Sequence, residues 1–204
     1  MRVNKKKFIY LISPNKIYKK FFKDLQKVLE TGKISFFQLR LKKYSFKHKI
    51  LIGQKIKNIC KKNKVKFLIN DDPILAKRLD ADGCHLGQKD MNIKEARKII
   101  GKKIIGITCH NSITLAKIAI KAKASYLAFG AFYSSKTKKT KYAVNIKILN
   151  KIKKITKTPI VAIGGINSKN YKKLLLNNAN FLAISGYIWN NKKYKPLEAL
   201  ERLK

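Results

Sequence analysis

The feature that most constrains the fold of this chain is a regular alternation between short β-like runs and longer, lysine-rich helical stretches. The predicted strands are residues 7–13, 34–40, 66–70, 83–86, 103–108, 126–130, 159–164 and 181–185. The predicted helices are residues 18–30, 47–62, a short one after residue 71, and then 93–100, 113–123, 145–155, 168–177 and 196–203. Each strand is therefore followed by a crossover.

Eight such units in 204 residues indicate an α/β protein, a compact (β/α)₈ TIM barrel. An open doubly wound sheet is the competing arrangement. No low-complexity linker or break in composition divides the chain, so residues 1–204 are expected to form a single domain. In a barrel, function belongs to the loops that leave the C-terminal ends of the strands.

The charge is extreme, with 49 Lys and Arg against 10 Asp and Glu and a formal net charge of +39. Lysines recur in every segment, which is typical of solvated faces rather than of one basic patch. We therefore expect no specific nucleic-acid partner, and a non-catalytic nucleic-acid-binding protein is a remoter alternative. The charge favours capture of a small phosphorylated substrate.

Three features predict a cytoplasmic protein without a membrane partner. Cys60, Cys84 and Cys109 form no CxxC pair and leave one thiol over, which argues against a secreted disulfide framework. The first apolar run stops at Pro14 and is too short for a signal peptide. No stretch approaches the length of a membrane span.

Two scarce acids, Asp71 and Asp90, each lie just beyond a short apolar run. Polar neighbours of these acids are Asn70, His85 and Gln88. Acids placed at successive strand ends suggest a site for a metal or a polar substrate. The alternative is that Asp71 and Asp72 cap the helix that begins at Pro73.

Polar side chains recur at every second position along the second predicted strand and just beyond its end. Period-two alternation places Gln38, Arg40 and Lys42 on one face, and the opposite face carries Phe37, Leu39 and Leu41. In a barrel the apolar face meets the helices, so the polar row points into the mouth, where it could hold phosphate oxygens. Decoration of an exposed edge strand would give the same alternation.

Two further segments could bind anions. Residues 130–140 are expected to form a loop rich in hydroxyl and ammonium groups that could close over a diphosphate. The same composition is also typical of a solvated basic loop without a ligand. Gly164-Gly165 and Ser185-Gly186 follow the last two strands, where barrels often bind phosphate through backbone N–H groups.

A zinc site built from Cys84-His85 and Cys109-His110 also has to be considered. Within a strand, adjacent side chains point to opposite sides, so the four groups cannot easily converge. We therefore expect buried thiols and one or two site histidines. His48, in a lysine-rich helix, is expected to be exposed.

Taken together, the ordered motifs resemble the thiamine phosphate synthase family over nearly the whole chain. They are Q-x-R-x-K, N-D, A-D-G-x-H-L-G-Q-x-D, a T-x-T-K-like loop, A-I-G-G-I and a closing I-S. The resemblance implies a TIM-barrel transferase that joins 4-amino-2-methyl-5-hydroxymethylpyrimidine diphosphate to a thiazole phosphate, or its carboxylated form. The products would be thiamine phosphate and diphosphate, and Mg²⁺ would be required.

The resemblance also implies roles for individual residues. Asp71 and Asp90 would ligate Mg²⁺, and Thr108 would contact the aminopyrimidine. The diphosphate oxygens would be held by Gln38, Arg40, Lys42, Asn70 and Lys138. The thiazole phosphate would be bound by Ser135, Thr137, Gly165, Ile184 and Ser185. Catalysis would rest on Arg40, Asp71, Asp90 and Lys138.

The chain departs from the family pattern in places. Leu41 replaces a common acid, Thr108 a usual Ser, and Ala131 a usual Pro. The stretch 134–136 replaces one that contains Pro and Thr, which puts the closing loop and Ser135 in question. A related thiazole tautomerase would use a His near the fifth strand, a role open to His110, but it has no use for the paired acids.

Overall fold

The computed structural model describes residues 8–134 and 144–203, and in them eight parallel strands close into a barrel in sequence order. The (β/α)₈ prediction is confirmed, and the open doubly wound sheet is excluded. The strands are β1 (Ile9–Ile12), β2 (Ile34–Leu39), β3 (Lys66–Asn70), β4 (Gly83–Leu86), β5 (Ile104–His110), β6 (Tyr126–Phe129), β7 (Ile160–Ile163) and β8 (Phe181–Ile184). β1 pairs with β8 through Ile9 and Leu182, which completes the circle.

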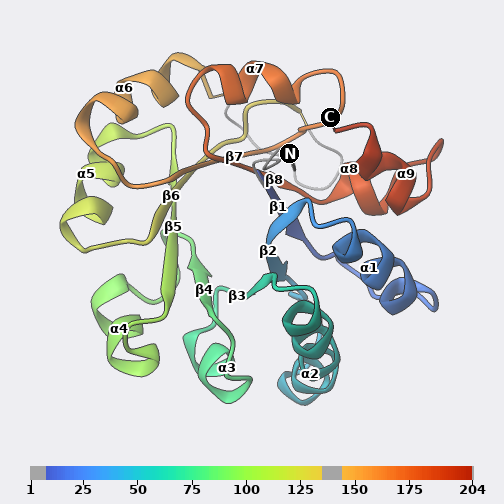
Figure 1. The fold of residues 1–204 in the computed structure, drawn as a ribbon. Coiled ribbons are helices and arrows are strands. Elements are labelled where there is room, and N and C mark those ends of the chain that lie inside the picture. The colour runs from blue at the N-terminus through green and yellow to red at the C-terminus, as the bar shows by residue number, and fades with distance from the viewer. Residues whose placement is uncertain (1–7, 135–143, 204) are drawn as a thin grey trace, which may run out of the picture.

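The helices form an outer ring around the strands (Figure 1). They are α1 (Phe21–Glu30), α2 (Phe46–Lys62), α3 (Pro73–Arg78), α4 (Ile93–Ile100), α5 (Ile113–Lys121), α6 (Lys147–Ile155), α7 (Tyr171–Leu176), α8 (Gly186–Trp189) and α9 (Pro196–Glu201). Several begin at side-chain caps, such as the Ser45 hydroxyl that accepts from the His48 N–H. None of the helices in the described residues is long and apolar enough to cross a membrane.

The core has two layers, because alternate residues of each strand face opposite ways. Outward-facing residues such as Phe37, Leu39 and Cys84 pack against the helices. The inward-facing layer contains Tyr10, Ile12, Leu68, Tyr126, Ala128, Val161 and Ala183. Two polar residues are buried with them among the described residues, Ser13 and Gln38. The barrel interior is therefore filled by packed side chains, and its buried polar residues lie toward the C-terminal ends of the strands.

Element boundaries differ from the predictions in a few places. β5 continues to His110 through a shift in register after Thr108. The helix expected from residue 18 begins at Phe21, where no side chain caps it. The four-residue α8 was not predicted; its Trp189 is buried, and the indole N–H donates to the Ile12 carbonyl over 2.7 Å.

Candidate active site

Asp71 and Asp90 meet at the C-terminal end of the barrel. Asp71 directly follows β3, and its N–H donates to the His85 carbonyl of β4 over 2.8 Å. Asp90 lies in the next loop, where its Oδ2 accepts from the Gly87 N–H at 2.7 Å. The two carboxyl groups lie close enough for each to shift the pKa of the other. Both acids of the predicted site therefore lie at the same end of the barrel, and their role as metal ligands stays a prediction.

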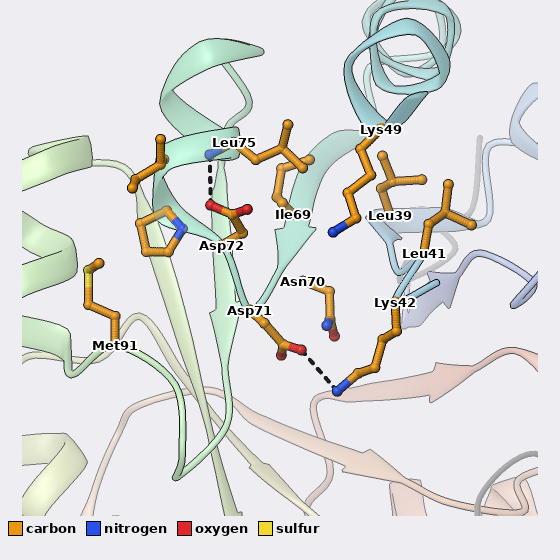
Figure 2. Close-up of a pocket in the computed structure, with 12 residues that line it drawn as sticks. Leu39, Leu41, Lys42, Lys49, Ile69, Asn70, Asp71, Asp72, Leu75 and Met91 are labelled. Atoms are coloured by element: carbon orange, nitrogen blue, oxygen red, sulfur yellow. Dashed lines mark hydrogen bonds and ion pairs between the residues drawn. The ribbon is translucent and has the colours of Figure 1, made fainter. Parts of the chain in front are cut away.

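Lys42 completes the group from the end of β2. Its Nζ lies 3.0 Å from Asp71 Oδ2, and Figure 2 shows the two side chains pointing toward one another, with Asn70 beside them. Asp71 and Asn70 line a cavity of about 470 Å³. Lys49 of α2 lines the same cavity and was missed by the sequence analysis, because its position in a lysine-rich helix carries no distinguishing signal.

The neighbouring Asp72 has a different role. Its Oδ1 accepts from the Leu75 N–H at 2.9 Å and caps α3 (Figure 2). Asp71 has a left-handed backbone, with φ of 64°, that turns its side chain away from the helix start. Helix capping and the candidate site are thus divided between two adjacent acids.

The surroundings of the two carboxyl groups shift their pKa values in opposite directions. Burial raises the pKa of Asp71, but hydrogen bonds from Lys42 and Asp90 and the charge of Lys42 outweigh burial and hold that pKa below its usual value. Burial raises the pKa of Asp90, and the Asp71 charge adds to it against the opposing Gly87 N–H. Asp71 is therefore the stronger acid of the two, and Asp90 the weaker.

The polar row of β2 is oriented as predicted. Phe37, Leu39 and Leu41 pack outward in the core. Arg40 donates to the Asn15 Oδ1 at 3.1 Å. Gln38 is 2 % exposed and turns its amide nitrogen toward the Tyr10 hydroxyl at 3.0 Å.

A hydrogen-bonded chain crosses the barrel interior from Gln38 to Thr108, and we call these five residues the interior chain. From Gln38 it passes to Tyr10, whose hydroxyl is 2.8 Å from that of Tyr126. Tyr126 lies 2.9 Å from His85 Nδ1, and His85 Nε2 lies 2.9 Å from Thr108 Oγ1. Tyr10 and Tyr126 were missed by the sequence analysis. The available signal was a tyrosine at an inward position of an apolar strand, since a buried hydroxyl needs a partner.

Burial lowers the pKa of His85 to about 4, with the Asp71 charge opposing it. At neutral pH the imidazole is uncharged. The Gln88 amide donates to the Thr108 carbonyl and holds the backbone next to this side chain.

The glycine pair after β7 is required by the loop that packs on it. Gly165 has a φ of 61°, and a Cβ there would lie 2.4 Å from the Ser134 carbonyl oxygen. A Cβ on Gly164 would meet Ala131 at the same distance. The structure therefore explains the glycines by close approach of residues 131–134, in addition to any contact with a ligand.

The last strand ends close to the first. Ser185 Oγ donates to the Ser13 carbonyl at 3.0 Å. The Ile184 side chain is 2 % exposed and packs in the outer core, so its backbone is the part that a ligand at the mouth could reach. Ser135, Thr137 and Lys138, expected in the closing loop, lie outside the described residues.

The cysteine and histidine pairs do not converge. Cys84 and Cys109 are fully buried in the outer core, His85 belongs to the interior chain, and His110 is exposed. Burial raises the pKa of both thiols to about 12, so neither supplies a thiolate at neutral pH. Within residues 8–134 and 144–203 there is no cluster of three or more His, Cys, Asp or Glu with metal-site spacing.

The donor set of the acid pair fits Mg²⁺. Mg²⁺ is commonly held by one or two carboxylates with substrate phosphates and water supplying the other ligands, so Asp71 and Asp90 suffice when a phosphate is present. The Lys42 ammonium beside Asp71 indicates that this position attracts a cation. Soft ligands are absent from the described contacts of the pair, which favours a hard metal ion.

Comparison with known proteins agrees with this arrangement. Residues 9–188 match the family model described as thiamine monophosphate synthase. The chain belongs to this family. A thiamine-phosphate synthase of Pelagibacter ubique (strain HTCC1062) is 69 % identical over 207 residues, which cover 100 % of both chains. A thiamine-phosphate synthase of Clostridium acetobutylicum is 36 % identical and covers 92 % of this chain and 89 % of its own.

A solved structure extends the likeness to three dimensions. Thiamine phosphate pyrophosphorylase from Pyrococcus furiosus superposes with a TM-score of 0.85 at 28 % identity, covering 97 % of this chain and 94 % of its own. The protein is therefore a transferase of thiamine biosynthesis that forms thiamine phosphate. The tautomerase and nucleic-acid-binding alternatives lose their support.

Proposed function

We propose that the protein joins 4-amino-2-methyl-5-hydroxymethylpyrimidine diphosphate to thiazole phosphate, or its carboxylated form, with Mg²⁺ held by Asp71 and Asp90. The observation that carries the Mg²⁺ site is the ion pair of Lys42 with Asp71 at the barrel mouth, with Asp90 near enough to shift the pKa of Asp71. When bound, Mg²⁺ supplies positive charge that stabilises the departing diphosphate. The proposed location is the cytoplasm, in keeping with the unpaired, buried thiols.

The leaving diphosphate is proposed to meet hydrogen-bond donors from several segments, most of them cationic. Arg40 and Lys42 rise from the end of β2, and Asn70 ends β3. We assign Lys138 of the closing loop to the same group. Fixed donors of this kind stabilise charge as it develops on the leaving oxygen, and their preorganisation reduces the reorganisation needed during reaction.

No protein nucleophile takes part in this proposal. A dissociative step makes a pyrimidine cation, which the thiazole nitrogen attacks, so the protein has to bind, orient and exclude water. The buried thiols and the neutral His85 are consistent with that division of labour.

We also propose a different assignment for one residue, Gln38. Gln38 turns its amide nitrogen toward Tyr10, so its side-chain oxygen, an acceptor, is the end of the amide without a described partner. An acceptor is poorly suited to diphosphate oxygens, so we assign Gln38 together with Thr108 to the aminopyrimidine. The thiazole phosphate is assigned to Gly165, Ser185 and the backbone of Ile184, with Ser135 and Thr137 from the closing loop.

The proposal is tested by incubating purified protein with both substrates and following thiamine phosphate and diphosphate. We expect product with Mg²⁺ and none after chelation, with activity restored by added Mg²⁺. Product formation that is unchanged by chelation would remove the metal from the proposal. Isomerisation of the thiazole without condensation would favour the tautomerase instead.

A further inference from the structure

Tyr10 is a member of the interior chain to which the proposed reaction gives no role. Tyr10 lies on β1, is 1 % exposed, and sits below the mouth. Its hydroxyl bonds to Gln38 on one side and to Tyr126 on the other. In the described residues no other side chain joins these two, so Tyr10 links the β2 side of the barrel to the β6 side.

The contacts of the interior chain favour one direction for its hydrogen bonds. The Gln38 amide donates to the Tyr10 oxygen, and Tyr126 is the one remaining partner of the Tyr10 hydroxyl among the described residues, so we assign the Tyr10 proton to that contact. Tyr126 then donates to His85 Nδ1, which must carry no proton. A neutral imidazole consequently holds its proton on Nε2 and donates it to Thr108 Oγ1.

The two ends of the interior chain are therefore complementary. Thr108 accepts from His85 and keeps its own proton free to donate to a ligand. At the other end no described residue donates to the Gln38 side-chain oxygen, which is free to accept. The interior chain thus has an available acceptor on β2 and an available donor on β5, and the chemistry of this pair suits the amino group and ring nitrogen of an aminopyrimidine.

The geometry gives the arrangement little freedom. The Tyr126 ring fills the space beside Gly106, where a Cβ would lie 1.9 Å from the ring carbon that bears the hydroxyl. Tyr126 also stacks on the His85 ring, with centroids 5.6 Å apart. If the Gln38 amide were rotated so that its oxygen faced Tyr10, each hydrogen bond from Tyr10 to Thr108 would run in the opposite direction. The free group of Gln38 and the donor or acceptor character of Thr108 are therefore linked.

We propose that Tyr10 is a positioning residue for the pyrimidine substrate. Its hydroxyl fixes the orientation of the Gln38 amide and, through Tyr126 and His85, makes Thr108 a hydrogen-bond donor. This inference rests on the proposed assignment of Gln38 and Thr108 to the pyrimidine. Tyr10 itself lies beneath these residues and acts through them.

The first test is kinetic and uses Tyr10→Phe, which keeps the ring and removes the hydroxyl. We expect KM for the pyrimidine diphosphate to rise about tenfold, the effect of misplacing about one hydrogen bond, while KM for the thiazole phosphate changes less than about twofold. Phe36→Leu is the matched control. Phe36 packs against the Tyr10 ring, with centroids 5.3 Å apart, but belongs to no part of the interior chain.

The control separates positioning from loosened packing. If both variants lower the melting temperature and Tyr10→Phe alone shifts KM for the pyrimidine substrate, positioning is supported. Equal effects of the two variants on both KM values would overturn the proposal, and so would a Tyr10→Phe variant with unchanged KM values.

The second test reads the protons directly and needs no activity. Nitrogen NMR of protein labelled at histidine, with His85→Asn used to assign its signal, should show His85 protonated on Nε2. Tyr10→Phe should give a mixture of the two neutral forms. A wild-type His85 protonated on Nδ1, or an unaltered tautomer in Tyr10→Phe, would refute the mechanism. Absence of product from wild-type protein would instead refute the proposed function.

Discussion

Two adjacent acids are expected to give opposite phenotypes, although each precedes the same helix. Asp72 caps α3 through the Leu75 N–H at 2.9 Å, whereas Asp71 contacts Lys42 and Asp90. We predict that Asp72→Ala lowers stability and keeps turnover. Asp71→Asn should keep stability and lose turnover.

The magnitudes follow from the contacts. Loss of an N-cap costs about 1 kcal/mol, which in a chain of 204 residues lowers the melting temperature by roughly 2–4 °C. Asn tolerates a φ of 64° as well as Asp does. The ion pair with Lys42 has side chains that are 57 % and 29 % exposed, so its loss costs about 0–1 kcal/mol.

The catalytic cost of Asp71→Asn should be much larger. Removing one group that supports the charge on a leaving group lowers kcat/KM by roughly 10²-fold, which corresponds to about 2.7 kcal/mol. The loss should become smaller as Mg²⁺ is raised, because mass action compensates in part for a weaker site.

Urea unfolding and initial rates at several Mg²⁺ concentrations measure both effects. Asp72→Asn is the control, because Asn caps a helix as well as Asp and should change neither quantity. The reasoning would be refuted if Asp71→Asn retained kcat/KM within about threefold at low Mg²⁺. It would also fail if Asp72→Asn lost turnover while remaining folded.

Three further predictions concern other parts of the site. Asp90→Asn should lower kcat/KM by about tenfold or more while leaving the urea midpoint within error, and an unchanged rate at low Mg²⁺ would exclude Asp90 from the metal site. Gly165→Ala should cost about 1–3 kcal/mol, measured by urea unfolding, because its Cβ would lie 2.4 Å from the Ser134 oxygen at a φ of 61°; stability equal to wild type would contradict that packing. The pKa of His85 is lowered from 6.5 to about 4, so the unfolded chain binds the extra proton between these values. The contribution of His85 to the free energy of unfolding is present above pH 6.5 and declines as pH falls toward 4, by up to about 1.4 kcal/mol per pH unit. A His85→Asn variant whose free energy of unfolding has the same pH dependence as wild type would refute this prediction.

The barrel could be predicted from the sequence because its signals are local. Each strand is an apolar run of the right length, and closure follows from eight crossovers of one kind. The ends of the helices and strands were harder to predict. β5 runs past Thr108 only because a shift in register against β6 lets it continue to His110, and nothing local encodes that pairing.

The candidate site also contains features that the sequence could predict and one that it could not. Asp71, Asp90 and Lys42 stand at strand ends, where period and topology alone bring them together. The direction of the Gln38 amide could not be predicted, since it depends on Tyr10, which is 28 positions away in sequence. Long-range hydrogen bonds of this kind become visible once strand neighbours are known.

The Lys42 contact has a consequence for how ligands assemble at the mouth. In the free protein the Asp71 carboxylate is already neutralised by a cation tethered to the chain. A metal ion that arrives alone has to displace that ammonium group, which leaves it without a partner. A diphosphate that arrives with the metal offers the displaced ammonium a new anion. The two ligands should therefore bind with positive heterotropic coupling, each raising the affinity for the other by the same factor.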